Sequence, residues 1–109
     1  MIEEPIEKSL DFIRNNAGAL AKAKAERIYM DEYRKSLKAI LYQKAPQGTI
    51  ADREAWAYSE QDYLDHLKAL QTAVEEEERL KWLMVAAQCK IEVWRSQNAS
   101  ARFIDKVHT

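Results

Sequence analysis

Apolar residues recur at helical spacing through most of this chain, and breaks in that spacing mark the expected helix ends. The apolar residues from Ile6 to Ile13 fall three or four positions apart, which predicts a short helix within residues 1–16. Asn16 is expected to interrupt or cap this helix, and Gly18 to loosen the junction that follows.

A longer stripe of the same kind predicts a helix over residues 17–44. The sequence Ala-Pro-Gln-Gly ends it, because Pro46 disfavours helical geometry in the residue before it. Residues 45–50 are therefore expected to form a linker. The apolar stripe of the long helix consists of Leu20, Ile28, Leu37, Ile40 and Leu41.

Residues 51–104 predict a short helix followed by a long one. Thr49 is a suitable N-cap for the short helix, with Asp52 in the capping-box position, and Ser59 is a second cap candidate. Residues 61–109 contain no Gly or Pro, which favours one continuous helix. The apolar spacing is interrupted near Glu77, so two helices with a kink are the alternative. Its apolar stripes consist of Tyr63, Leu67, Leu70 and Val74, and then of Leu80, Leu83, Ala87, Ile91 and Trp94.

Together these elements predict an all-α fold. We expect a single domain, residues 1–109, in which the two long helices form an elongated antiparallel hairpin with short accessory helices. Two Gly and two Pro among 109 residues suit helices and leave few turn residues for hairpins of strands. A slender hairpin buries little surface, and three Trp and five Tyr are many large aromatics for it. We therefore expect a homo-oligomer.

The formal net charge of −1 hides a strong segregation along the sequence. Residues 1–16 are acidic, 17–44 basic, 45–79 acidic and 80–109 basic. Seven of the 17 Lys and Arg residues lie in the basic helix at 17–44. Two interpretations stay open: the segments attract each other on folding, or the two basic segments come together on one surface.

The densest charge block is the acidic run from Glu75 to Glu78. On a helix it stands one turn before Arg79 and Lys81, which predicts a solvated face with local ion pairs. The alternative is that these acids dock on the basic residues of 17–44 and mask them.

Cations and aromatic residues alternate near the C-terminus, where Trp94 and Phe103 stand among Lys90, Arg95 and Arg102. This combination suits single-stranded nucleic acid, because cations hold phosphates and flat rings stack on bases. The alternative is a Trp94 buried between helices, with cations that simply solvate the helix end.

Little in the sequence suits catalysis, and we expect neither enzyme activity nor a cofactor. Asp62 and His66 stand one turn apart, but two ligands make a poor metal site, so an exposed hydrogen-bonding pair is predicted. Cys89 is expected to be a core thiol within a helix. No run is apolar enough to span a membrane, the acidic start lacks a signal core, and one cysteine fits a reducing compartment, so a cytoplasmic location is expected.

The strongest candidate site is a cationic surface for single-stranded nucleic acid. Its predicted residues are Lys22, Lys24, Arg27, Arg34, Lys35, Lys38, Arg95 and Arg102.

Four features follow one another along residues 20–102: a Lys/Arg-rich long helix, a short linker, an R-E-x-x-A-Y-like element and a long helix ending in Trp-Arg-Ser. In the third element the residues are Arg53, Glu54, Ala57 and Tyr58. This layout resembles the phage recombination mediators of the UvsY type. The resemblance implies a non-enzymatic protein of a bacterial host cytoplasm that forms rings or other oligomers, binds single-stranded DNA and helps a recombinase load where a single-strand-binding protein is bound.

A second hypothesis needs no nucleic acid. The charged faces and surplus aromatics also fit a helical protein-protein interaction module, such as an adaptor or an inhibitor of a host factor.

Overall fold

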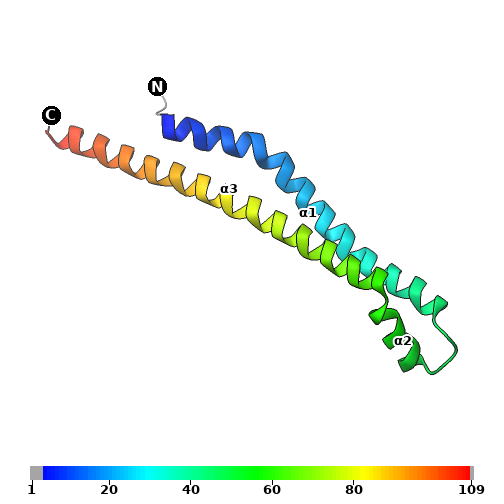
Figure 1. The fold of residues 1–109 in the computed structure, drawn as a ribbon. Helices are drawn as coiled ribbons and strands as arrows, with labels where there is room; N and C mark the ends of the chain where they lie inside the picture. The colour runs from blue at the N-terminus through cyan, green and yellow to red at the C-terminus, as the bar shows by residue number, and fades with distance from the viewer. Residues whose placement is uncertain (1–3, 109) are drawn as a thin grey trace. The chain divides into compact units, whose positions relative to one another are not determined.

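The computed structural model describes residues 4–108, with side chains from Ile6 onward, and these residues form an all-α fold (Figure 1). Three helices follow in chain order, α1 (Glu4–Lys44), α2 (Ile50–Ser59) and α3 (Gln61–His108), and the described residues contain no strand. The bend around α2 reverses the chain, so that α3 runs back antiparallel to α1. The predicted hairpin of long antiparallel helices is confirmed, whereas its oligomeric state stays a prediction.

The helix α1 is continuous through the position where the sequence predicted a break between residues 16 and 17. Asn16 does not cap a helix there, because its Nδ2 donates to the Phe12 carbonyl, 2.9 Å away and one turn earlier. Gly18 has no positive φ and continues the helix. The separate N-terminal helix was therefore wrong, and residues 1–3 of that predicted segment lie outside the described residues.

The bend and α2 follow the predicted capping only in part. Thr49 caps α2, since its Oγ1 accepts a hydrogen bond of 3.0 Å from the Asp52 amide. Ser59 does not cap α3 as predicted, because its Oγ donates to the Trp56 carbonyl at 2.9 Å. The extended residue Glu60 separates the two helices instead, and its carbonyl accepts the first α3 bond.

The last helix, α3, is uninterrupted from Gln61 to His108. The continuous helix favoured by the sequence is therefore confirmed over the alternative of two helices with a kink. It also runs a few residues beyond the predicted end at 104.

The chain divides into two compact units. Ala21–Glu78 forms a unit that contains the bend, which we call the hairpin unit. The described residues of Met1–Leu20 and Arg79–Thr109 form the other, which we call the terminal unit. Each unit thus combines a segment of α1 with a segment of α3.

In the hairpin unit the two long helices meet along a heptad seam, whose positions alternate at intervals of three and four residues as in a coiled coil. All of these positions are buried or half-buried, although several carry polar side chains. They are Ala23, Arg27, Met30, Arg34, Leu37 and Leu41 on α1, and Tyr63, His66, Leu70, Ala73 and Glu77 on α3.

Several apolar residues of the predicted stripes are exposed instead. Ile28 and Ile40 of α1 keep 45% and 44% of their surface in water, and Leu67 and Val74 of α3 are exposed as well. The reason is that arginine, histidine and glutamate side chains occupy seam positions in this unit. A stripe defined by apolar residues alone therefore includes residues that lie beside the contact face rather than on it.

The terminal unit has a seam of the same spacing. Its α1 positions include the buried Ile6 and Ser9, and its α3 positions include the buried Leu80 and Ala87. Trp94 ends the α3 row half-buried, while Leu83, which the sequence assigned to the stripe, is exposed. The remaining members of the seam, all half-buried, are Ile13, Asn16, Leu20, Met84 and Ile91.

A small core closes the bend in the hairpin unit. Leu41, Ala57 and Tyr63 are buried together, one from each helix. Ala57 has no exposed surface, which leaves no room there for a larger side chain. The ring of Tyr58 meets that of Tyr63 edge-on at 5.2 Å. Leu37, Tyr42 and Trp56 pack around this core.

Arg53 links α2 to the C-terminal end of α1 through its contacts with Tyr42. Its Nη2 donates to the Tyr42 carbonyl at 2.9 Å, and its guanidinium lies 4.4 Å from the centroid of the Tyr42 ring. Carbonyls in the last turn of a helix lack intrahelical partners and carry partial negative charge. A cation at this point therefore stabilises the α1 terminus, although its own Nε is buried without a hydrogen-bond partner among the described residues.

We expect Gly18→Ala to stabilise the protein by roughly 0.5–1 kcal/mol, because alanine restricts the unfolded chain and favours helix. An added Cβ would meet nothing within 4 Å. The measurement is urea unfolding followed by circular dichroism. Gly48→Ala in the bend is the control and should bring no comparable gain, since its Cβ would meet Asp52 at 3.4 Å. Destabilisation at position 18 would contradict a continuous α1.

We expect Arg53→Ala to destabilise the protein by about 2 kcal/mol and Arg53→Met by about 1 kcal/mol. Methionine keeps the apolar stem against the Tyr42 ring but removes the charge at the helix end. The same unfolding measurement separates the two contributions. A methionine variant as stable as the wild type would show that the charge at the α1 terminus contributes nothing.

Candidate nucleic-acid interface

Each unit pairs a basic stretch with a more acidic one. In the hairpin unit, residues 21–44 carry seven bases and three acids, while residues 45–78 carry two bases and nine acids. In the terminal unit, residues 79–108 carry six bases and two acids, and residues 4–20 carry two and three. Of the two interpretations left open by the sequence, association of segments of opposite charge is the one seen within each unit. Within each unit, the basic segment lies with a segment that carries more acids than bases.

The best example is the contact between Arg27 of α1 and Glu77 of α3. Arg27 Nε donates to Glu77 Oε2, and its Nη2 donates to Oε1 at 3.2 Å, so the pair is bidentate. The Glu77 side chain keeps only 13% of its surface exposed. The hydrogen bond with the Glu77 carboxylate raises the pKa of Arg27, so the positive charge of Arg27 is held in this ion pair. The alternative in which the acidic run docks on the basic helix holds for this pair.

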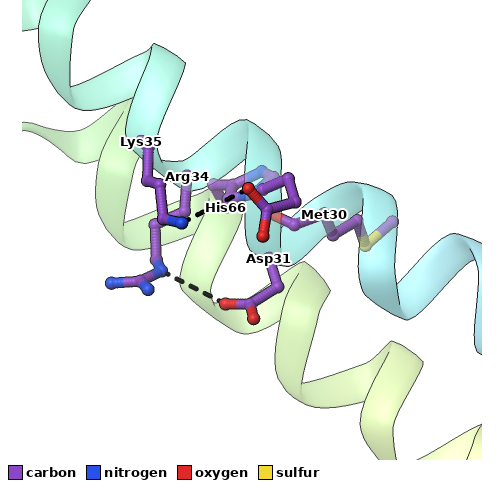
Figure 2. Close-up of polar contacts among 6 residues, drawn as sticks. Met30, Asp31, Arg34, Lys35 and His66 are labelled. Carbon is purple, nitrogen blue, oxygen red and sulfur yellow. Dashed lines mark hydrogen bonds and ion pairs between the residues drawn. The ribbon is translucent and has the colours of Figure 1, made fainter.

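Two further predicted cations of α1 contact acids on their own helix (Figure 2). Arg34 Nε lies 3.5 Å from Asp31 Oδ1, and Lys35 Nζ lies 3.3 Å from Glu32 Oε2. Arg34 also lies in the seam, where a hydrogen bond to the Tyr63 hydroxyl raises its pKa. The Lys35 side chain is well exposed, so its surface pair contributes little stability and leaves it accessible to a ligand.

Beside these residues, His66 reaches across from α3 to α1, as Figure 2 shows. Its Nε2 lies 2.6 Å from the Met30 carbonyl oxygen, and its ring tilts against that of Tyr33 at 5.4 Å. The predicted exposed pair with Asp62 was wrong, because His66 occupies a seam position and is half-buried. The residue joins the two long helices.

Lys38 borders a groove of about 740 Å³ in the hairpin unit, lined also by Arg34, Lys35, Tyr42 and Glu54 among others. Its Nζ lies 3.5 Å from Glu54 Oε1 and 4.7 Å from the centroid of the Tyr58 ring. A hydrogen bond to Tyr58 raises the pKa of Lys38, and Glu54 adds to this. The groove is therefore mixed in charge, and Lys38 is held by neighbours on α2.

Lys22 and Lys24 differ from the other α1 candidates. Both are exposed, and within the described residues neither has a hydrogen bond or ion pair. They belong to a unit with nine bases and twelve acids, a net charge of −3. The field around them is therefore weaker than the basic sequence of 17–44 suggested.

Arg95 and Arg102 lie in the terminal unit, on the C-terminal part of α3. Together with Trp94, Asn98 and Ala99 they line a shallow hollow. The Arg95 guanidinium bonds Glu92 one turn earlier at 2.9 Å, with both side chains about two-thirds exposed. Arg102 is exposed and makes no ion pair with the described residues. Among the described residues, this is the one place where predicted cations line a hollow together with an indole ring.

The sequence interpretation missed what the R-E-x-x-A-Y-like element does. Arg53 caps α1, Glu54 pairs with Lys38, Ala57 fills the bend core and Tyr58 packs on Tyr63. All four residues hold the bend together. The signal that could have shown this is their position directly after the only Pro-Gly-containing break in the long helical pattern.

Two other residues change their assignment. Cys89 is exposed rather than a core thiol, because it lies on the α3 face turned away from the seam. Glu77, which marked the slip in the apolar pattern, is a seam residue.

Searches against protein-family models, curated proteins and solved structures found no match to this chain. Within residues 4–108, no group of three or more His, Cys, Asp or Glu side chains could hold a metal ion. The described helices include none with the length and apolarity to cross a membrane.

We expect Glu77→Met to lower the melting temperature clearly, because it leaves the half-buried Arg27 guanidinium without its carboxylate. The double variant Arg27→Met with Glu77→Met should recover most of this loss, since two packed apolar side chains replace the pair. Thermal unfolding by circular dichroism compares the double variant with the two single variants, Arg27→Met and Glu77→Met.

Glu32→Ala is the matched control, since it breaks a pair at the surface. Its effect should stay within about 0.5 kcal/mol. A double variant less stable than both single variants would contradict this account of the seam.

Proposed function

We propose that this protein is a non-enzymatic accessory protein that binds single-stranded DNA, with its main contact surface on the C-terminal part of α3. Arg95 and Arg102 are its central cations, and Trp94 offers a partly exposed indole ring for base contact. Lys22, Lys24 and Lys35 are secondary contacts, while Arg27, Arg34 and Lys38 serve mainly to hold the hairpin unit together.

The observation that carries this proposal is the hollow around Trp94, Arg95 and Arg102. Two exposed guanidinium groups beside an indole can hold successive phosphates and still leave bases room to stack. The charge of the units supports the same choice. The described residues of the terminal unit carry eight bases and five acids, whereas the hairpin unit is net acidic.

The role in recombination is the finer part of the proposal and rests on the resemblance to UvsY-type mediators. In that role the protein acts in the cytoplasm of a bacterial host, as an oligomer, and helps a recombinase load onto DNA coated by a single-strand-binding protein.

A second candidate function is a helical protein-protein interaction module, an adaptor or an inhibitor of a host factor. It is favoured by the exposed apolar residues of α3, among them Trp82, Val93 and Phe103, which are more than half exposed. Such a module would retain a stoichiometric protein partner in the absence of DNA.

We expect the wild-type protein to bind a fluorescein-labelled single-stranded oligonucleotide, with affinity that falls steeply between 50 and 200 mM salt. Removing two phosphate contacts by Arg95→Ala with Arg102→Ala should reduce the slope of log K against log salt by roughly 1.4, because each contact on a single strand contributes about 0.7. Fluorescence anisotropy at several salt concentrations measures this.

The matched control is Arg34→Ala with Lys35→Ala, which removes the same charge from α1. It should change the slope by less than the α3 variant. Equal effects would contradict the assignment of the main surface to α3, and absence of binding by the wild type at low salt would overturn the proposal of DNA binding. Circular dichroism of each variant confirms that it is folded.

A further inference from the structure

The C-terminal part of α3 carries a second heptad row on the face turned away from α1. Counting by alternating steps of four and three residues from Cys89 leads to Val93, Ser96, Ser100, Phe103 and Val107, and every one of these positions is exposed. Val93, Phe103 and Val107 keep 55%, 67% and 62% of their surface in water. Trp82, seven residues before Cys89, extends the row toward the N-terminus of the helix.

This outer row is distinct from the seam that packs on α1. Successive residues of an α-helix are 100° apart, so the row centred on Val93 and Ser100 lies on roughly the opposite side from Ala87 and Ile91. A heptad row on one helix covers its apolar positions only when another helix packs along it. The α1 segment of the terminal unit is already occupied by the inner seam.

We propose that the outer row of α3 binds the same row of a second copy of this chain, with the two α3 helices antiparallel. This inference does not depend on DNA binding. In the antiparallel register centred near residue 98, Val93 faces the partner's Phe103 and Cys89 faces the partner's Val107. Ser96 faces the partner's Ser100, so the two hydroxyl positions meet each other rather than an apolar side chain.

Charge complementarity selects a second copy and this orientation. Glu92 and Lys106 both flank the outer row in the same heptad position, next to Val93 and Val107. Antiparallel helices pair such positions with each other, which brings Glu92 beside the partner's Lys106 at both ends of the contact. In a parallel dimer Glu92 would face the partner's Gln97, so this ion pair between the two copies would not form.

The α3 helix is already formed in each copy, so association orders little additional backbone, which favours binding over three heptads. Arg95 and Arg102 lie more than 100° round the helix from the outer row, because they fall at other heptad positions. Dimer formation therefore leaves both guanidinium groups accessible, although Ser96 borders the hollow and also belongs to the outer row. The two proposals can fail separately.

Light scattering after size-exclusion chromatography of the full chain tests the dimer. We expect a dimeric mass for the wild type at micromolar concentration, and for Val93→Glu a dissociation constant at least ten times higher. Ile50→Glu is the matched control, because it places the same charge at an exposed aliphatic residue of α2 and should leave the dimer intact. A monomeric wild type, or a Val93→Glu variant that dimerises as well as the wild type, would overturn the proposal.

Charge reversal and cross-linking test the orientation. Glu92→Lys should weaken the dimer several-fold, and adding Lys106→Glu should restore it, because the pair is then reversed. Under mild oxidation Val107→Cys should form an intermolecular disulfide with Cys89 of the partner subunit, while the wild type should not cross-link. Rapid Cys89–Cys89 cross-linking of the wild type, or no rescue by the second charge reversal, would instead indicate parallel helices and overturn the antiparallel arrangement.

Discussion

The bidentate contact between Arg27 and Glu77 is the constraint on which the hairpin unit depends. A slender pair of helices has few fully enclosed side chains, and apolar contacts alone permit one helix to slide along the other by a heptad. A half-buried guanidinium and a carboxylate with 13% of its surface exposed do not permit such a slip, because each would lose its partner. The contact of His66 with the Met30 carbonyl adds a second fixed point in the same seam.

The same polar seam explains how far the sequence could predict the structure. The long helices, the bend and the cap at Thr49 follow from local chemistry and were predicted, whereas the break after residue 16 and the cap at Ser59 were predicted wrongly. The contact face was not predictable from apolar residues alone, since Ile28 and Ile40 are exposed where Arg27 and Arg34 are half-buried. Polar residues that pair across a seam look like surface residues until the partner helix and its register are known.

The candidate site was also only partly predictable, because the availability of its cations depends on ion pairs between residues distant in sequence. A run of Lys and Arg on one helix indicated a DNA surface, but the fold sets that run within a unit rich in acids and fixes several of its cations. What could be predicted was that Arg95, Arg102 and Trp94 lie close together, because these residues are neighbours in sequence on a single helix. Which cations remain available depends on long-range pairing, such as that of Lys38 with Glu54, and this required the structure.

The bend also has a consequence for how the molecule folds. Arg53 reaches Tyr42 across a separation of only 11 residues, His66 reaches Met30 across 36, and Glu77 reaches Arg27 across 50. Each contact away from the bend encloses a longer loop of chain, and the entropy cost of closing that loop falls once the inner contact exists. We therefore expect the helices of the hairpin unit to associate from the core around Ala57 outward, and local unfolding to proceed in the opposite order.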